Sequence, residues 1–213
     1  MRRLVPVIVW AALAVGAFGA SAAAQPREAL GGAVVDLRVV STTLPTGLGW
    51  TPPVATAGAL VPGRGVGAEG GVFLFAGPGR FKRLSFGATG FLAEGRATGV
   101  AATGGNAPTM ATRMFAAAPH AALNFGHRDG WSYLSIGAGT AKVRATQDGV
   151  EDQPASWGLA FHYGGGARWF VREHLAVSLD LRFWALTPQP ATTARPSAAA
   201  TTRIAIGAGV SFR

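Results

Sequence analysis

The sequence contains no cysteine, and only 14% of its residues are charged. Without cysteine there is neither a disulfide framework nor a thiolate metal site. Acidic residues are also scarce, with 10 Asp and Glu against 19 Lys and Arg, for a formal net charge of +9. The basic residues are scattered singly and form no basic stripe. The composition therefore does not indicate a nucleic-acid partner, and we expect contact with anionic lipid headgroups instead.

Long hydrophobic runs are missing except at the amino terminus. There Arg2 and Arg3 precede an apolar stretch that reaches about Phe18, and small residues follow up to Gln25. This order predicts a secretory signal peptide over residues 1–24 and a single exported domain over residues 25–213. The alternative is an uncleaved membrane anchor, because the uncharged stretch is nearly long enough to span a bilayer.

The rest of the chain is unusually apolar, with a mean hydropathy of +0.28 for the whole sequence. No later run is long enough for a membrane helix. The apolar residues therefore have to lie in segments that alternate with small or polar residues. The closing stretch shows this pattern clearly, because Ile204, Ile206 and Phe212 alternate with Arg203 and Ser211. A period of two indicates a β-strand with two different surroundings.

Eight segments of this kind follow one another in the exported domain, and short and long connections alternate between them. The segments are about 30–41, 66–76, 83–93, 110–125, 131–143, 157–171, 175–186 and 201–213. Asp129-Gly130 marks one short hairpin. Short turns on one side and long loops on the other are typical of outer-membrane barrels, as are the even strand number and segments of about ten residues.

The strand face that carries small and charged residues is expected to point inward. In the seventh segment Leu179, Leu181 and Phe183 alternate with Asp180 and Arg182. Other segments place glycine, alanine and serine on the same face as the charges, and such residues suit the narrow interior of an eight-stranded barrel. The apolar face is then expected to meet lipid. A soluble barrel would point its apolar face inward instead.

The alternating last strand with Phe212, the LDLRF of Leu179 to Phe183 and the eight-segment plan resemble small bacterial outer-membrane barrels of the OmpA-like type. The resemblance implies an all-β, eight-stranded antiparallel up-and-down transmembrane β-barrel in the outer membrane, without a cofactor. It also implies contact with outer-membrane lipid and lipopolysaccharide, and recognition of the last strand by the barrel-assembly machinery. In the family that strand usually ends on an aromatic residue, whereas here Arg213 follows Phe212.

Charged residues on the inward face suggest an internal ionic network. VVDLRVV (34–40) and SLDLRFW (178–184) both place Asp and Arg two residues apart, and their two strands would flank the last one. We expect Asp36, Arg38, Asp180 and Arg182 to form this network, with Arg168 and Arg203 as further members. Two roles are open: residues that plug the interior, or a gate for small ions.

Two histidines and a set of aromatic residues complete the candidates. His162 lies in FHYGGG, which resembles the histidine strand of lipid A deacylases, but Gly164 stands where those enzymes have a serine nucleophile. His120 has no adjacent nucleophile either, and neither histidine has carboxylates at a metal-ligand spacing. Both are expected to be interior, hydrogen-bonded side chains, with no metal and no catalysis. An interfacial aromatic girdle is expected from Phe81, Phe125, Trp131, Trp169, Phe170 and Phe212.

The expected function is a structural or surface-interaction role through the long outer loops, whose partner the sequence does not name. A weak passive ion conductance is a further option. Two alternatives belong to other classes: a soluble periplasmic lipocalin-like barrel that binds an apolar ligand, and a lipid-modifying outer-membrane enzyme.

Overall fold

The computed structural model describes residues 32–47, 49–50, 59–76, 84–101, 105–127, 129–151, 157–191 and 196–213. The predicted signal peptide lies outside these ranges. The strands are β1 (Ala33–Thr43), β2 (Arg64–Ala76), β3 (Leu84–Thr98), β4 (Thr109–His127), β5 (Gly130–Gln147), β6 (Val150–Glu151), β7 (Gly158–Arg172), β8 (Leu175–Leu186) and β9 (Thr201–Phe212). Among the described residues, no helix has the length and hydropathy that crossing a membrane would require.

Eight of these strands form one closed antiparallel barrel. The hydrogen-bonded order is β4-β3-β2-β1-β9-β8-β7-β5, and a further pairing of β4 with β5 closes the circle. The last strand pairs with the first, so that Val35 lies opposite Phe212 and Thr42 lies opposite Ala205. The two-residue β6 only extends the β5 hairpin. The predicted eight-stranded antiparallel barrel is confirmed.

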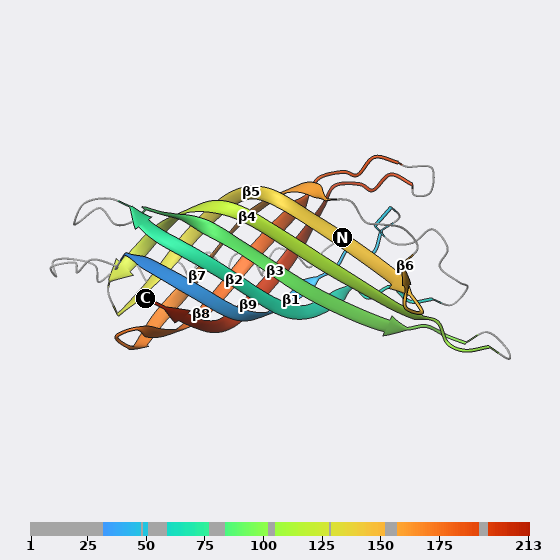
Figure 1. Cartoon of the computed structure of the whole chain (residues 1–213), viewed down its shortest axis with the longest axis horizontal. Coiled ribbons are helices and arrows are strands. Elements are labelled where there is room, and N and C mark those ends of the chain that lie inside the picture. The colour runs from blue at the N-terminus through green and yellow to red at the C-terminus, as the bar shows by residue number, and fades with distance from the viewer. Residues whose placement is uncertain are drawn as a thin grey trace, which may run out of the picture.

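Connections divide the barrel into two different ends (Figure 1). β7 and β8 are joined by the two residues between Arg172 and Leu175, and the chain ends at the same side of the barrel. The segments 44–63, 99–108, 148–157 and 187–200 connect strands at the opposite end, where β6 also lies. We call these the short-turn end and the loop end. The alternation that the sequence predicts is therefore present.

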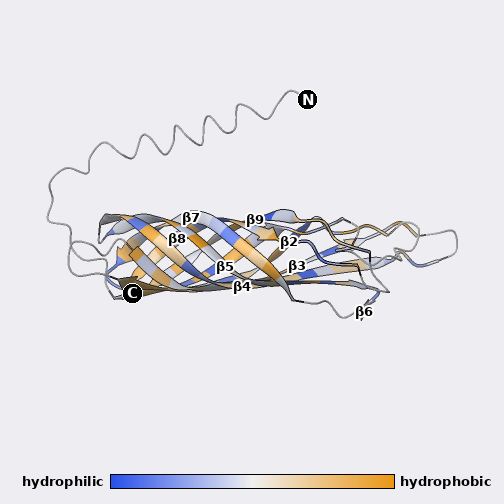
Figure 2. Ribbon diagram, turned by 90° about the horizontal axis from the view of Figure 1, so that it is seen from above, coloured by the Kyte–Doolittle hydropathy of each residue, from blue (hydrophilic) through white to orange (hydrophobic). Residues whose placement is uncertain are grey.

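The outward face is apolar along most of each strand, with charges only toward the loop end of β2 to β5, and the buried charges lie on the inward face. Leu179 and Leu181 on β8 are 47% and 43% exposed, whereas Asp180 and Arg182 between them are 3% and 0% exposed. Figure 2 shows hydrophobic and hydrophilic residues following one another along the strands. The inverted arrangement that a soluble barrel requires is not found in the described residues.

Apolar side chains fill the interior toward both ends. At the short-turn end Val34 and Trp131 are buried with Phe75 and Phe170 packed against them, and we call this group the short-turn aromatic cluster. A larger apolar group fills the loop half: Val40, Leu44, Trp50, Phe91, Ala93, Met114, Ala116, Ala118, Ala141, Val143, Ala160, Trp184, Leu186, Ala198 and Ala205. Two long loops contribute to it, because Trp50 Nε1 donates a hydrogen bond of 3.1 Å to the carbonyl of Ala199.

Candidate functional site: a buried ionic network

Asp36 on β1 accepts four side-chain hydrogen bonds in the interior. Arg168 from β7 donates to both of its carboxylate oxygens, Nε to Oδ1 at 3.0 Å and Nη2 to Oδ2 at 2.6 Å. Arg38 Nη2 donates to Oδ2 at 2.5 Å, and Ser211 Oγ from β9 donates to Oδ1 at 2.5 Å. Such a two-pronged contact between a guanidinium and a carboxylate fixes the relative orientation of both groups. Asp36 thereby ties together the two strands that close the barrel and β7 across the interior.

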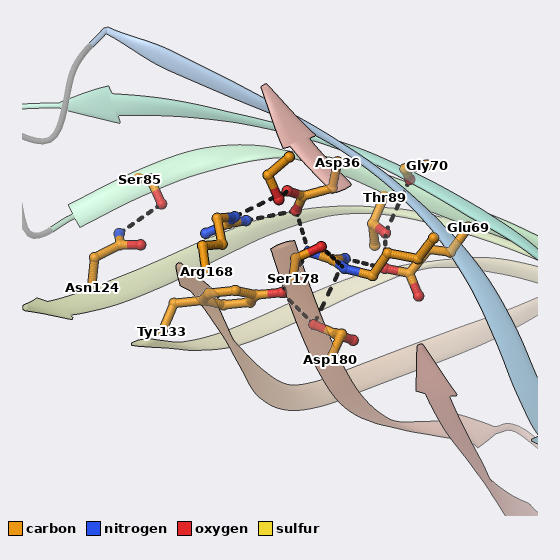
Figure 3. A network of polar contacts seen from close by, with 12 residues as sticks. Asp36, Glu69, Gly70, Ser85, Thr89, Asn124, Tyr133, Arg168, Ser178 and Asp180 are labelled. Carbon is orange, nitrogen blue, oxygen red and sulfur yellow. Dashed lines mark hydrogen bonds and ion pairs between the residues drawn. The ribbon is translucent and has the colours of Figure 1, made fainter. Parts of the chain in front are cut away.

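Arg38 extends the network from Asp36 to the other carboxylates. Its Nη1 donates to Glu69 Oε1 on β2 at 2.9 Å and lies 4.0 Å from Asp180 Oδ2. Its Nη2 also donates to the Tyr133 hydroxyl at 3.1 Å, and that hydroxyl in turn donates to Asp180 Oδ2. Figure 3 shows Glu69, Tyr133 and Asp180 converging from different strands. Arg38 therefore contacts all three buried carboxylates.

Arg182 completes the network on β8. Its Nη2 lies 3.1 Å from Asp180 Oδ2 and 3.5 Å from Glu69 Oε1. The network thus holds three guanidinium groups and three carboxylates, all at most 3% exposed. The residues are Asp36, Arg38, Glu69, Arg168, Asp180 and Arg182, and we call them the ionic network. The buried charges balance, as charges in a low-dielectric interior must.

Small residues on the inner wall make room for these long side chains. A Cβ atom on Gly166 would lie 2.7 Å from the Tyr133 hydroxyl, and one on Gly207 would lie 3.2 Å from Arg38 Cδ. Both positions face the network from β7 and β9. Glycine weakens a strand, so its presence here reflects the close approach of side chains from the neighbouring strands, Tyr133 on β5 beside Gly166 and Arg38 on β1 beside Gly207.

Aromatic rings pack against the guanidinium group of Arg168, which also pairs with Asp36. Its guanidinium carbon lies 4.2 Å from the centroids of both Phe73 and Tyr133. A guanidinium over an aromatic face gains a cation–π attraction, which is larger where water is excluded. Arg168 is thus held by a carboxylate and two rings.

The structure brings together five of the six charged residues that the sequence selects, and Arg203 stands apart from them. Its Nη1 donates to the carbonyl of Leu44 at 3.0 Å, and its Nη2 donates to the Thr201 hydroxyl. Arg203 is near the start of β9, at the loop end. It binds the barrel rim rather than the ionic network.

The histidines both lie inside the barrel but form no hydrogen bonds. His120 is 5% and His162 0% exposed, and none of their four ring nitrogens has a hydrogen-bond partner. Their rings are 6.0 Å apart, and each packs on an aromatic ring, Phe73 for His120 and Trp184 for His162. The interior position agrees with the expectation, and the expected hydrogen bonds are wrong. In the described part of the chain, no three potential ligands are grouped to hold a metal ion.

The expected aromatic girdle is only partly found on the outward face. Phe125, Trp169 and Phe212 point outward and are 43%, 50% and 44% exposed. Trp131 is 3% exposed and stacks on Phe170 inside the short-turn aromatic cluster, at a centroid distance of 4.9 Å. The alternation explains the difference, because Trp131 shares its parity with the buried Tyr133 on β5. Phe81 lies outside the described residues.

Glu69 and Tyr133 belong to the network although the sequence analysis did not select them. A signal for Glu69 was available: the selected set contained two carboxylates against four guanidinium groups, so the buried charge did not balance. Glu69 lies on the inward parity of β2 and is the only acidic residue of that strand. Tyr133, one of two tyrosines in the chain, likewise follows the inward parity of β5.

Comparison with known proteins reveals a similar fold and no similar sequence. No family model matches the chain, and no curated protein matches it in sequence. Among solved structures, Neisserial surface protein A (NspA) is similar with a TM-score of 0.56 at 10% identity, over 85% of this chain and 97% of that one.

Two further solved structures have lower TM-scores. Ail, the attachment invasion locus protein of Yersinia pestis, has a TM-score of 0.44 at 12% identity, over 85% of this chain and 99% of Ail. The outer membrane protein OprG from Pseudomonas aeruginosa has a TM-score of 0.45 at 10% identity, over 87% of this chain and 96% of OprG. By its strand order and its likeness to NspA, this chain has the fold of the small eight-stranded outer-membrane barrels.

Proposed function

We propose that this protein is a closed bacterial outer-membrane barrel with a structural or surface-interaction role, and that its long loops are the contact surface. One observation carries the proposal: the outward face is apolar along most of each strand, while six charged side chains are buried inside. Exposed apolar surface of this extent is unfavourable in water and favourable in a bilayer. The proposal includes export by a cleaved signal peptide over residues 1–24 and assembly through the last strand.

The interior supports a role without catalysis. His120 and His162 lie inside the wall, and no hydroxyl is hydrogen-bonded to either imidazole in the described structure. Nucleophilic catalysis needs such a base next to a nucleophile. The apolar packing toward both ends also separates these rings from bulk water.

The ionic network acts, in this proposal, as a plug that joins the walls rather than as an ion gate. Its charges pair with each other, and apolar clusters lie on both sides of it along the barrel. An ion would have to displace these side chains to pass. Open aqueous channels are found in barrels with about sixteen strands, twice the number present here.

Orientation of the loops can be tested with epitope tags in intact cells. A tag placed within residues 187–200, between β8 and β9, is expected to bind antibody on intact cells. The matched control is the same tag in the turn between Arg172 and Leu175, which should be accessible only after the outer membrane is permeabilised. Equal accessibility of both tags, or the reverse order, would contradict the proposed role of the loops.

A further inference from the structure

Five buried side chains beside the ionic network carry polar atoms that have no hydrogen-bond partner in the described structure. They are His120, Ser135, His162, Arg182 and Trp184, and we call them the donor cluster. Each is at most 5% exposed. In Arg182 the unpaired atom is Nη1, because Nε and Nη2 bind Asp180. Most buried polar atoms in proteins are hydrogen-bonded, so these atoms are expected to bind a further group.

The strand register places the donor cluster in two neighbouring rows of the barrel wall. Across β4, β5, β7 and β8, one row of paired residues reads His120, Gly137, His162 and Trp184. The next row, two residues closer to the short-turn end, reads Ala122, Ser135, Gly164 and Arg182. Residues two apart on a strand share a face, so both rows point inward. The donor cluster therefore occupies one continuous patch of the inner wall.

Glycines on neighbouring strands make room for the two imidazole rings. A Cβ atom on Gly137 would lie 2.4 Å from His162 Nε2, so the His162 ring lies against that glycine. A Cβ atom on Gly87 would lie 3.2 Å from His120 Nε2. The ring centroids are 6.0 Å apart. Packing thus positions both rings without hydrogen bonds, and their nitrogens stay available to a ligand.

The charges around the rings favour an anion over a metal ion. Arg182 interacts electrostatically with both imidazoles, and more strongly than the carboxylate of Asp180 does. Arg168 also acts on His120, again more strongly than either Asp36 or Asp180. The electrostatic potential at the rings is therefore positive, which opposes the binding of a cation.

We propose that the donor cluster binds one small monovalent anion of the halide class. Arg182 Nη1 and Trp184 Nε1 can only donate hydrogen bonds, and the Ser135 hydroxyl and one nitrogen of each imidazole can donate as well. A spherical halide accepts such bonds from several directions at once.

The anion has to be compatible with a balanced and closed interior. The charges of the ionic network already compensate each other, so an anion that enters with one proton on the imidazole pair keeps the interior neutral. Apolar groups lie toward both ends of the interior, so the anion would be enclosed as the barrel folds. The site lies inside the barrel and is independent of the proposed contacts of the loops.

The test uses the full-length protein purified from membranes in neutral detergent and unfolded with urea. Sodium chloride should raise the urea midpoint above that in sodium gluconate of equal ionic strength, because gluconate is too large for the site. The expected difference is about 0.5 M at a chloride concentration tenfold above the dissociation constant. It should be larger at pH 6 than at pH 8, since a proton enters with the anion.

Matched variants separate the donor cluster from general salt effects. Ser135→Ala and His162→Phe each remove a donor and should abolish most of the difference between the two salts. Thr112→Val is the control, because the Thr112 hydroxyl is also buried without a partner but lies outside both rows. This variant should retain the full difference. Crystals grown in sodium bromide should show anomalous scattering from one ion at the donor cluster.

Several outcomes would overturn the inference. Equal midpoints in the two salts would mean that water alone binds these side chains. An equal chloride effect in all three variants would be a general salt effect, and one that is the same at both pH values would exclude the imidazoles from the site. Stabilisation by Zn²⁺ that is lost in His162→Phe would assign the histidines to a metal ion. A retained heat-dependent gel shift in every variant shows that the barrel itself stands, so that failure here is distinct from failure of the proposed function.

Discussion

At the scale of single residues, ion pairs between carboxylates and arginines are expected to contribute differently to stability inside and outside the barrel. Asp36 and Glu94 each accept hydrogen bonds from two arginines. Asp36 is fully buried, whereas the side chain of Glu94 is 26% exposed and its partners more so. Removing one member of a buried ion pair leaves an uncompensated charge, while an exposed ion pair contributes little.

Substitution of Asp36 is therefore expected to destabilise the barrel far more than substitution of Glu94. Asp36→Ala leaves Arg38 and Arg168 without their shared partner and should lower the free energy of unfolding by about 3 to 5 kcal/mol. Glu94→Ala should change it by at most about 1 kcal/mol. Urea titration of the protein in detergent or lipid vesicles measures both. Equal effects would show that the ionic network does not stabilise the barrel.

Residue type and parity predicted most of the ionic network, but not its full membership. Asp36 and Asp180 could be selected because each is a charged residue in an otherwise largely apolar strand segment. Glu69 is flanked by glycine and alanine, so no apolar alternation marks it. Arg203 has the inward parity but lies too close to the rim to reach the network. Parity determines which face a side chain takes, whereas its height along the barrel depends on the stagger between strands, which a single sequence does not reveal.

At the scale of strands, β8 shows how alternation fixes the register. A shift by one residue would bring Asp180 and Arg182 to the outward face and bury Leu179 and Leu181. Its bounds, Leu175–Leu186, match the predicted segment. The outward residues of β8 are all apolar, whereas the inward ones include Ser178, Asp180 and Arg182, so only one register satisfies both surroundings.

A cation introduced on the outward face of β8 is expected to destabilise the protein in a depth-dependent way. Leu179→Arg lies near the middle of the strand and should cost about 2 to 4 kcal/mol in a bilayer. Thr202→Arg, outward on β9 and next to the loop end, should cost at most about 1 kcal/mol. The free energies of folding of the two variants can be compared by folding each into lipid vesicles at increasing urea concentrations. If both variants fold as well as the unchanged protein, the outward face does not meet hydrocarbon.

Strand ends were harder to predict than strand centres. β3 continues to Thr98 and β5 to Gln147, beyond the predicted ends at Ala93 and Val143. Both extensions begin where Glu94 or Arg144 replaces an apolar outward residue. The alternation of hydropathy stops there because the surroundings change, although the backbone ladder continues.

At the scale of the whole molecule, the barrel interior is filled at every level that the structure describes. The short-turn aromatic cluster, the ionic network and the loop-side apolar group follow one another along the barrel axis. An eight-stranded barrel has just enough interior for such side chains. The stability of the barrel and the proposed plug therefore rest on the same packed interior.

Conductance in planar bilayers tests this closed interior. The protein should produce no stable single-channel currents. The variant Trp184→Ala removes a fully buried ring from the loop-side group and is the control for sensitivity, because its vacated volume should admit transient currents. Regular channel openings by the unchanged protein would favour an ion gate over the proposed plug.

The central claim is that this protein forms a closed barrel in the outer membrane. Its mobility in gel electrophoresis tests this claim most directly. Protein from a purified outer-membrane fraction is compared before and after boiling in detergent. We expect the unboiled sample to migrate differently from the boiled one, since a closed barrel resists detergent until it is heated. Recovery in the soluble fraction, with identical mobility before and after boiling, would contradict the account.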